Sequence, residues 1–505
     1  MKGHETNWRL ILGDKAIERR LIIFLCLLAM VRVFLLNAAF PIFNPVDEVQ
    51  HFDTIVRYAE GDVYDSGVTD YSLNLWSAKI QIIYATPEYL HQELKDKIPT
   101  FRKMNRPDAP AIVDSLRQRI ADSLPNYEVH SPPIYYFLAG QWLNIGKLIF
   151  SNDGFLVYWL RFMNVFYYGL LLGGTYLFCK YFYPEDRAVR IGVPMLLAVF
   201  PNTIFYSLNN DVFSPLFCTL ALFMTLRICT GQRTILTYAL TGLAIASTLL
   251  VKLTNMPTFF VCTAIIAVFT YRLISTKDIA AKSQNLVALF TAMLAPLLLW
   301  MGWNLTVLGD LLGTEDKVRF LGWTRKPLLA WFGHPIFSIS GWKSAAENFH
   351  MLIYTLWRGD LVNWPDSLDA FFTISSVVFV IAVCARLYST RGRISSQKSL
   401  FSAACLAICI LYIAFIVISS IQFDFGKCFS PSQANPYFNK GRLIIGCLVP
   451  FLIIYIEGLE YILSLLKLKK YSLHFIGIIC LIILIATPIV TRQTFSSQWN
   501  WFHYF

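Results

Sequence analysis

Apolar runs about as long as a lipid bilayer is thick recur through this chain from one end to the other. A transmembrane helix needs roughly 20 consecutive, mostly apolar residues, and lipid tolerates only backbones whose polar groups are paired internally. Such runs occupy residues 21–40, 156–180, 189–207, 212–229, 234–251, 256–271, 286–307, 369–388, 400–421, 442–464 and 472–490. The sequence therefore predicts an all-α, polytopic integral membrane protein with about eleven transmembrane helices.

Composition narrows the class of protein further. Of the 505 residues, 56% are hydrophobic, and Lys and Arg outnumber Asp and Glu by 43 to 32, a formal charge of +11. In a membrane protein such an excess reports loop orientation and lipid headgroups. No basic patch interleaved with aromatics resembles a nucleic-acid surface, so that class is excluded. The eleven cysteines lie mostly in or beside apolar runs without CxxC spacing, which favours core residues over disulfides.

The distribution of Lys and Arg orients the chain. The first twenty or so residues are polar and basic, which predicts a cytoplasmic N-terminus and a retained first span. If residues 133–150 crossed the membrane, Lys180, Arg187 and Arg190 would lie outside, against the positive-inside rule. If that run stays in the outer leaflet, nearly every basic cluster falls inside. We therefore predict eleven spans, an outward C-terminus and a non-spanning membrane helix at 133–150.

Three parts are expected along the chain. Residues 1–307 form an N-terminal transmembrane module, and within it 41–155 form a long outer loop whose charged stretch at 88–119 predicts surface helices. Residues 308–368 form an outer-face loop rich in Trp and basic residues, and 369–505 hold the C-terminal transmembrane helices. Aromatic residues there suit a membrane-interface belt, and stacking on sugar rings is the alternative.

The stretch FNPVDEVQHFDTIVRYAE, just after the first run, concentrates polar chemistry. Asn44 is expected to cap a helix and Pro45 to occupy its first position. Asp47 and Glu48 then fall in the first turn, where the helix dipole favours negative charge, and His51 lies on the same face. The pattern predicts a carboxylate pair at a membrane surface with an imidazole beside it. Ordinary capping chemistry is the alternative.

Under the predicted topology, polar residues from distant parts of the chain share the outer face. They are His130, Arg161, Asp211, Lys252, Lys440 and Arg442. An Arg or Lys at a span end often reaches to lipid headgroups, and an Asp there often caps the next helix. Their gathering on one face favours a protein that acts on something delivered at that face.

Several segments resemble, in order, the GT-C superfamily of polytopic glycosyltransferases. VDEVQHF is similar to the family's "PDE…HF" segment, SPPIYYFLAG to its "HPPLYY" helix, and SLNNDVFSPLFCTLALF to its second acidic site. WLRFMNVFYYGLLL and FNKGRLIIGCLVPFLIIYIEGL resemble the "RLxNxLxGLL" and "QGRYLxPxLP" runs. The nearest likeness is to prokaryotic members that use polyprenyl-phosphate sugars. The chain departs from the family pattern at three positions. Val46 stands where the family commonly has Pro, Ser131 separates His130 from Pro132, and Leu443 replaces the Tyr of the GRY sequence.

The resemblance implies transfer of a sugar from a polyprenyl-phosphate donor to a hydroxyl of a glycan or lipid-linked acceptor. The reaction would invert the anomeric centre, on the extracytoplasmic face of the cell (inner) membrane, in surface polysaccharide (O-antigen or cell envelope) modification. Asp47 is the expected base, and Glu48 orients the acceptor or takes the proton instead. A phosphodiester-linked leaving group needs cations, not a general acid.

The remaining polar residues receive expected roles on the same basis. For the donor phosphate, the expected ligands are Arg161, Lys440, Arg442 and His130. The site is completed by His51, Asp211 and Lys252. No DxD motif stands at these positions, so no metal and no cofactor are assigned, and a divalent cation is left open. The competing classes are a solute or lipid transporter (flippase) without transfer chemistry and a structural assembly subunit.

Overall fold

The computed structural model describes residues 15–43, 47–62, 72–84, 126–151, 153–231, 234–275, 279–389, 397–497 and 499–503. Its longer helices are α2 (Lys15–Ala39), α3 (Glu48–Glu60), α4 (Leu75–Tyr84), α7 (Pro133–Ile149), α8 (Asp153–Phe182), α9 (Arg187–Ala198), α10 (Ser214–Thr230), α11 (Ile235–Val251), α12 (Met256–Ser275), α13 (Ile279–Leu308), α16 (Trp342–Arg358), α17 (Asp366–Ser389), α18 (Gln397–Gln422), α19 (Leu448–Leu465) and α20 (Ser472–Ser496). The predicted stretch of surface helices at 88–119 lies outside the described residues.

Short elements connect these helices. Two short α-helices are α14 (Glu315–Phe320) and α15 (Leu328–Trp331). The 3-10 helices are η4 (Thr203–Tyr206), η5 (Asn210–Phe213), η6 (Leu253–Asn255), η7 (Pro335–Phe337), η8 (Ile339–Gly341), η10 (Gly441–Cys447), η11 (Lys469–Tyr471) and η12 (Trp501–His503). Strand β1 (Thr324–Arg325) pairs antiparallel with β2 (Phe423–Asp424), with Thr324 opposite Asp424.

The predicted all-α membrane fold is confirmed, with fewer spans of full length than expected. Within the described residues, nine helices are long and apolar enough to cross a membrane. The expected runs 189–207 and 234–251 do not give such helices, because α9 has 12 residues and α11 has 17. At a rise of about 1.5 Å per residue, a 12-residue helix covers roughly 18 Å of a hydrocarbon core about 30 Å thick.

The chain beyond α9 continues through the protein interior as irregular backbone. Val199 to Phe213 are all buried and form only the short helices η4 and η5 before α10 begins. Irregular backbone at membrane depth is tolerated when protein surrounds it and satisfies its polar groups. Asn164 does so by donating to the carbonyls of Phe205 and Ser207. This broken segment brings Asp211 to the end of the bundle where α3 lies.

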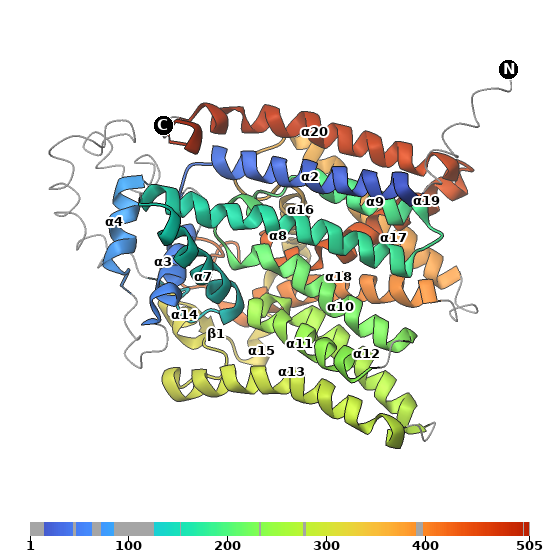
Figure 1. Ribbon diagram of the computed structural model, residues 1–505, viewed down its shortest axis with the longest axis horizontal. Helices are drawn as coiled ribbons and strands as arrows, with labels where there is room; N and C mark the ends of the chain where they lie inside the picture. The colour runs from blue at the N-terminus through green and yellow to red at the C-terminus, as the bar shows by residue number, and fades with distance from the viewer. Residues whose placement is uncertain are drawn as a thin grey trace.

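The two ends of the bundle differ in character (Figure 1). One end gathers α3, α4, α7 and α14, and the last turn of α20 reaches it. The opposite end holds the start of α2, the junction of α8 and α9 with Lys180, Arg187 and Arg190 in the flanking helical turns, and the Lys-rich turn that follows α19. Helix α7 packs on α3 and α8 and is not one of the helices long enough to span, as predicted for residues 133–150. We call the two ends the α3 end and the basic end.

Ion pairs tie the basic end together across helices that are distant in sequence. Arg190 of α9 pairs with Glu18 of α2 at 2.9 Å, and Arg386 of α17 pairs with Glu457 of α19 at 3.0 Å. Lys398 of α18 contacts Asp186, which also caps α9. Because these pairs are buried or half-buried, they fix the order of the helices more firmly than exposed pairs would.

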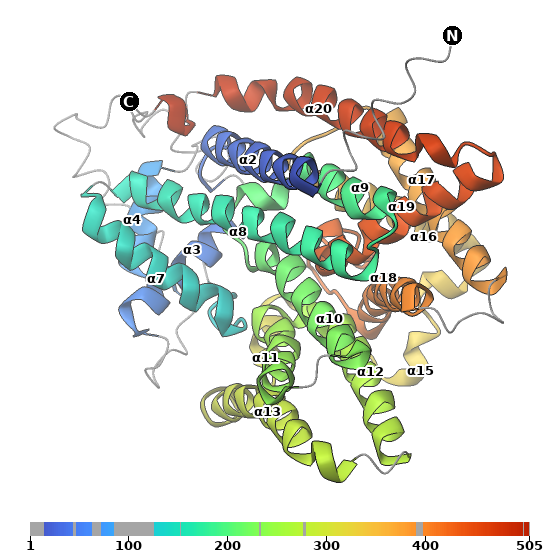
Figure 2. The same ribbon diagram turned by 45° about the vertical axis from the view of Figure 1, so that its right-hand side comes forward.

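Helices α10 to α13 form one flank of the bundle (Figure 2). Helix α11 packs tightly on α13 and on α10. The closest approach is at Gly242, where a Cβ atom would lie 2.2 Å from the carbonyl oxygen of Leu289. Small residues let membrane helices approach in this way, so that packing can replace the missing hydrophobic force.

Substitution of Gly242 tests this packing. Gly242→Ala should separate α11 from α13 and lower the free energy of unfolding by about 1–3 kcal/mol, as overpacking does. A lower midpoint of thermal unfolding in detergent would show it. The control is Gly173→Ala in α8, where a Cβ atom meets nothing within 4 Å. An unchanged midpoint for Gly242→Ala would contradict the close approach.

Candidate active site

Asp47 stands directly before α3 in a conformation that few non-glycine residues adopt. The helix begins at Glu48, three residues later than the predicted start, and Asn44–Val46 lie outside the described residues. Asp47 has φ +66°, in the left-handed region. Such a conformation persists only when surrounding contacts hold it, and it recurs at functional sites.

Asp47 is held by one cation and one hydroxyl. Its Oδ2 lies 2.7 Å from a guanidinium nitrogen of Arg442, which belongs to η10, and the Tyr127 hydroxyl donates to its Oδ1. The side chains of Arg442 and Asp47 are 23% and 14% exposed, so the pair remains open to an incoming group. The pair joins the start of α3 to η10, which leads into α19.

Glu48 points away from Asp47 and into the core. Its carboxylate pairs with Arg161 of α8 through contacts of 2.6 and 2.8 Å, and both side chains are fully buried. The carboxylate also accepts from the backbone N–H groups of Phe43 and Leu208. Four donors therefore surround the carboxylate, which is the number that two oxygens accept well.

Arg161 is fully engaged as well. Besides Glu48, its guanidinium donates to the carbonyl oxygens of Asn37, Phe40 and Pro41. These contacts use all five of its N–H groups. The geometry therefore does not support the expected phosphate-binding role of Arg161 or a proton-accepting role of Glu48. The predicted carboxylate pair is divided, with one acid at the site and one in the core.

The second predicted acid forms its own pair. Asp211, in η5, lies 2.6 Å from Lys252, which follows α11. Asp211 is fully buried and Lys252 is 18% exposed. Burial lowers the pKa of Lys252, which Asp211 partly offsets. The structure thus brings these two expected site residues into contact.

Sequence reasoning missed three residues in this region. Tyr127 and Glu128 precede the Pro-Pro start of α7, and Lys317 lies in α14 of the 308–368 segment. Glu128 is buried, contacts Lys317, and accepts a hydrogen bond from Ser131. The only available signal was the position of Tyr127 and Glu128 beside the motif SPPIYYFLAG, which by itself names no role.

His51 lies in the first turn of α3, four residues after Asp47. Its Nδ1 is 2.7 Å from the Tyr136 hydroxyl, and the ring is buried. Burial lowers the pKa of His51 to about 4, against the opposing charges of Glu128 and Asp47. At neutral pH the imidazole is therefore uncharged.

The carboxylates nearest His51 stay ionised despite burial. Burial acts to raise the pKa of Asp47, but the charge of Arg442 and the Tyr127 hydrogen bond outweigh it, so that pKa lies well below its usual range. For Glu128, burial likewise acts to raise the pKa, but the charge of Lys317 outweighs it and the pKa is lowered to about 2. Each acid is thus matched by a cation.

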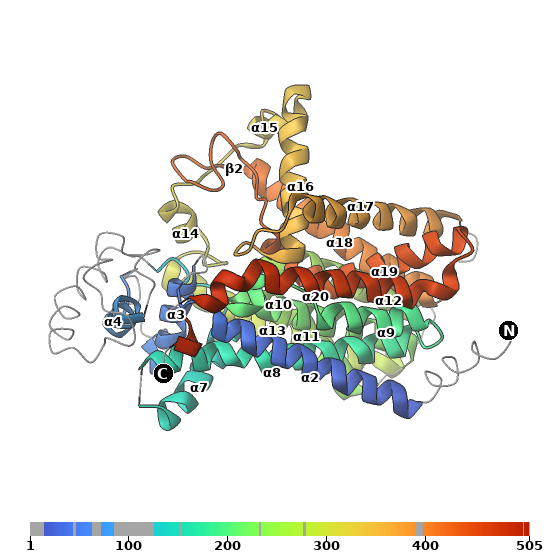
Figure 3. The same cartoon turned by 90° about the horizontal axis from the view of Figure 1, so that it is seen from above.

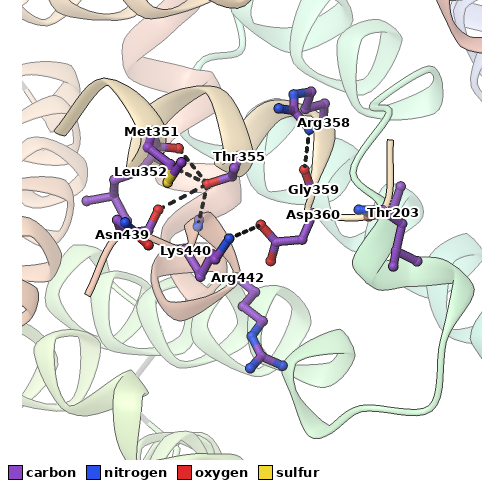
Figure 4. Close-up of polar contacts among 12 residues, drawn as sticks. Thr203, Met351, Leu352, Thr355, Arg358, Gly359, Asp360, Asn439, Lys440 and Arg442 are labelled. Carbon is purple, nitrogen blue, oxygen red and sulfur yellow. Dashed lines mark hydrogen bonds and ion pairs between the residues drawn. The ribbon is translucent and has the colours of Figure 1, made fainter. Parts of the chain in front are cut away.

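Lys440 and Arg442 project from one turn that packs against α16 (Figure 4). The Lys440 ammonium lies 3.7 Å from the Asp360 carboxylate, and Arg442 extends from the same turn away from α16. Between them, Gly441 donates its N–H to the Thr355 hydroxyl at 2.7 Å. A Cβ atom at Gly441 would lie 1.9 Å from the backbone nitrogen of Leu356, so only glycine fits there.

His130 lies in the turn before α7 and is buried. Its expected phosphate contact stays a prediction. Among the residues that the structure describes, no group of three or more His, Cys, Asp or Glu side chains has the arrangement of a metal site. The role of a divalent cation likewise stays open.

Comparisons with known proteins give one family and one distant structure. A family model described as "Predicted membrane protein (DUF2142)" matches residues 31–427. No curated protein matches the chain. Among solved structures, archaeal oligosaccharyltransferase AglB from Archaeoglobus fulgidus, in complex with an inhibitory peptide and a dolichol-phosphate, is similar at 12% sequence identity and a TM-score of 0.36. The match covers 94% of this chain but 56% of the archaeal chain, little more than half its length.

The buried pair of Glu48 and Arg161 predicts a clear difference between adjacent acids. Glu48→Gln leaves Arg161 without its counter-charge and should lower the free energy of unfolding by about 3–5 kcal/mol. Asp47→Asn is the matched control, because Asn tolerates the left-handed conformation and the pair it breaks is partly exposed, a loss of about 1 kcal/mol. Thermal unfolding of both variants in detergent checks this. Equal midpoints would contradict the structural role of Glu48.

Proposed function

This chain belongs to the DUF2142 family of predicted membrane proteins, and we propose that it is a glycosyltransferase that uses a lipid-phosphate-linked sugar. The observation that carries the proposal is the contact between Asp47, a carboxylate able to accept a proton, and Arg442, a cation able to bind a phosphate. In this proposal the two groups act on opposite sides of the same anomeric carbon.

The leaving phosphate is assigned to Arg442 and Lys440. Both project from the η10 turn, and both are partly exposed. Their present partners, Asp47 and Asp360, are carboxylates that an incoming phosphate can replace. When the anomeric C–O bond breaks, its electron pair goes to the phosphate oxygen, and preorganised cations stabilise the charge that develops there.

Asp47 is assigned as the general base. It takes the proton of the acceptor hydroxyl while that oxygen attacks the anomeric carbon, and the anomeric configuration inverts. In the resting site Arg442 keeps the pKa of Asp47 low, which makes it a weak base. A phosphate that pairs with Arg442 removes that effect, so the pKa of Asp47 rises and donor binding strengthens the base.

A hollow beside the η10 turn supports a donor with a lipid chain. It has a volume of about 320 Å³ and lies between α16 and α18, with mostly apolar side chains such as Phe349, Leu352 and Ile416 in its walls. Asn348, also in the wall, accepts a hydrogen bond from Asn439 at 2.7 Å. Asn439 directly precedes Lys440, so apolar and cationic surfaces meet there, as an anionic amphiphile requires.

Asp211 and Lys252 are assigned to the sugar, because η5, which carries Asp211, packs against η10, which carries Arg442. Glu128 and Lys317 are assigned to holding α14 over the site. The proposed setting in cell-envelope polysaccharide modification rests on the family resemblance.

One observation favours a second candidate, a transporter without transfer chemistry. The buried irregular backbone from Val199 to Phe213 interrupts the bundle, and broken helices mark many transporters. However, the ion pairs of the site gather at the α3 end, whereas transporter sites lie near the middle of the membrane.

Asp47→Asn should abolish sugar transfer while leaving the protein folded. Loss of a positioned base lowers kcat by about 10²–10⁴. The assay uses purified protein, a panel of radiolabelled polyprenyl-phosphate sugars and a cell-envelope acceptor fraction, and counts label in new glycosidic product. Asp316→Asn, a carboxylate paired with Arg319 in α14, is the matched control. Unchanged product from Asp47→Asn rejects the base, and movement of label without a new bond favours the transporter.

The proposal also places the α3 end outside the cytoplasm. In intact cells, a membrane-impermeant maleimide should label a cysteine at Arg319, in α14, and should leave one at Lys470, at the basic end, unlabelled until the cells are opened. Both positions are exposed. The reverse pattern of labelling would overturn this orientation.

A further inference from the structure

Residues 328–349 expose an unusual amount of apolar surface. This segment, the arm, contains α15, η7, η8 and the first half of α16. Its large exposed hydrophobic side chains are Leu328, Leu329, Phe332, Phe337, Ile339, Trp342 and Phe349. Leu329 and Ile339 are 87% and 85% exposed. So many exposed apolar side chains within 22 successive residues indicate a surface that something else covers.

The direction of α16 indicates what covers the apolar surface of the arm. In Figure 3, α16 runs across the direction of α17, α18 and α20 and stands out sideways from the bundle, beside the beginning of α17. The latter three helices are long and apolar enough to span a membrane. An element perpendicular to spanning helices lies parallel to the membrane plane. Helix α16 therefore runs parallel to the plane of a membrane that those helices cross, beside the beginning of α17.

The first half of α16 presents three faces, two of which meet at the hollow. Ala345, Asn348 and Leu352 face the protein and the hollow against α18. Trp342, Ala346 and Phe349, at helical spacing, form an exposed apolar face, and Ala346 and Phe349 also line the rim of the hollow. Next to it, Lys343 and Glu347 form an exposed polar face with an ion pair of 4.0 Å. Exposed apolar and polar faces side by side are typical of a helix at the boundary between lipid and water.

The charges near the arm and the apolar surface of the neighbouring helix α18 also favour a lipid environment for the arm. Lys343 is 89% exposed and Arg325, just before the arm, is 60% exposed. They pair with Glu347 and Glu315, and an anionic headgroup can compete for either cation. On α18, which packs against α15, Leu411 and Ile418 are exposed in a span-length helix. The apolar surface of the arm thus continues the lipid-facing surface of the bundle.

We propose that the arm lies in the interface of the bilayer, with its apolar side chains among the upper acyl chains and Lys343 and Glu347 in the aqueous headgroup layer. The partner of this surface is therefore the lipid itself rather than a protein. This inference depends on the fold and not on the proposed transfer reaction.

The arm also connects the lipid surface to the candidate site. Asn348, at its end, accepts a hydrogen bond from Asn439, and Thr355 in the second half of α16 accepts one from the Gly441 N–H. Lys440 and Arg442 lie on either side of Gly441 in the η10 turn. The depth of the arm in the lipid therefore sets the height of these two cations above the acyl region.

Spin labels at three positions test the proposal. Leu329→Cys, Ile339→Cys and the control Glu347→Cys are made in a full-length protein whose reactive cysteines are replaced, and each is labelled and placed in lipid nanodiscs. Power saturation compares collisions with oxygen, which concentrates in acyl chains, and with a water-soluble nickel chelate. Oxygen collisions should dominate at 329 and 339, and the ratio should reverse at 347.

Two results would overturn the proposal. Nickel-dominated collisions at 329 and 339 would mean that the arm stands in water, and shielding from both reagents would mean that a protein or a second copy covers it. A second measurement uses the unsubstituted chain, so it does not depend on the folding of variants. A lipid with a photoreactive group near the top of its acyl chain should label residues 328–349, and absence of label there would contradict the proposal.

Discussion

The contact between Asp47 and Arg442 organises the candidate site, because it joins residues 395 positions apart in sequence. The negative charge of the Asp47 carboxylate and the positive charge of the Arg442 guanidinium balance each other, so this ion pair carries no net charge. The pair is partly exposed, and a charged ligand can therefore compete for either member. In our proposal the donor phosphate takes Arg442 and thereby frees Asp47.

This contact depends on two supports that themselves carry no chemistry. Glu48 and Arg161 anchor the start of α3 in the core, which aims Asp47 outward. Thr355 and the close approach at Gly441 hold the turn that carries Arg442. Breaking one partner of a buried ion pair costs about 3–5 kcal/mol. The position of the site is therefore fixed by buried, saturated interactions, while its own groups remain exchangeable.

The sequence predicted the class of fold, because apolar run length and charge placement have direct physical meaning. The roles of the site residues stay predictions, although the structure brings Asp47 to Arg442 and Asp211 to Lys252. The sequence could not separate Asp47 from Glu48, since both occupy one short stretch and only tertiary contacts decide which acid is buried. The sequence assigned Arg161 to the donor phosphate, because a sequence does not show that all five N–H groups of this guanidinium are already hydrogen-bonded within the protein. Span counting overshot at α9, where an apolar run continues as irregular buried backbone.

A structure with a bound polyprenyl-phosphate would test the central claim most directly. The account predicts that the phosphate lies within hydrogen-bonding distance of Arg442 and Lys440, with Asp47 released from Arg442 and facing the acceptor side. A phosphate bound elsewhere, with the contact between Asp47 and Arg442 intact, would contradict it.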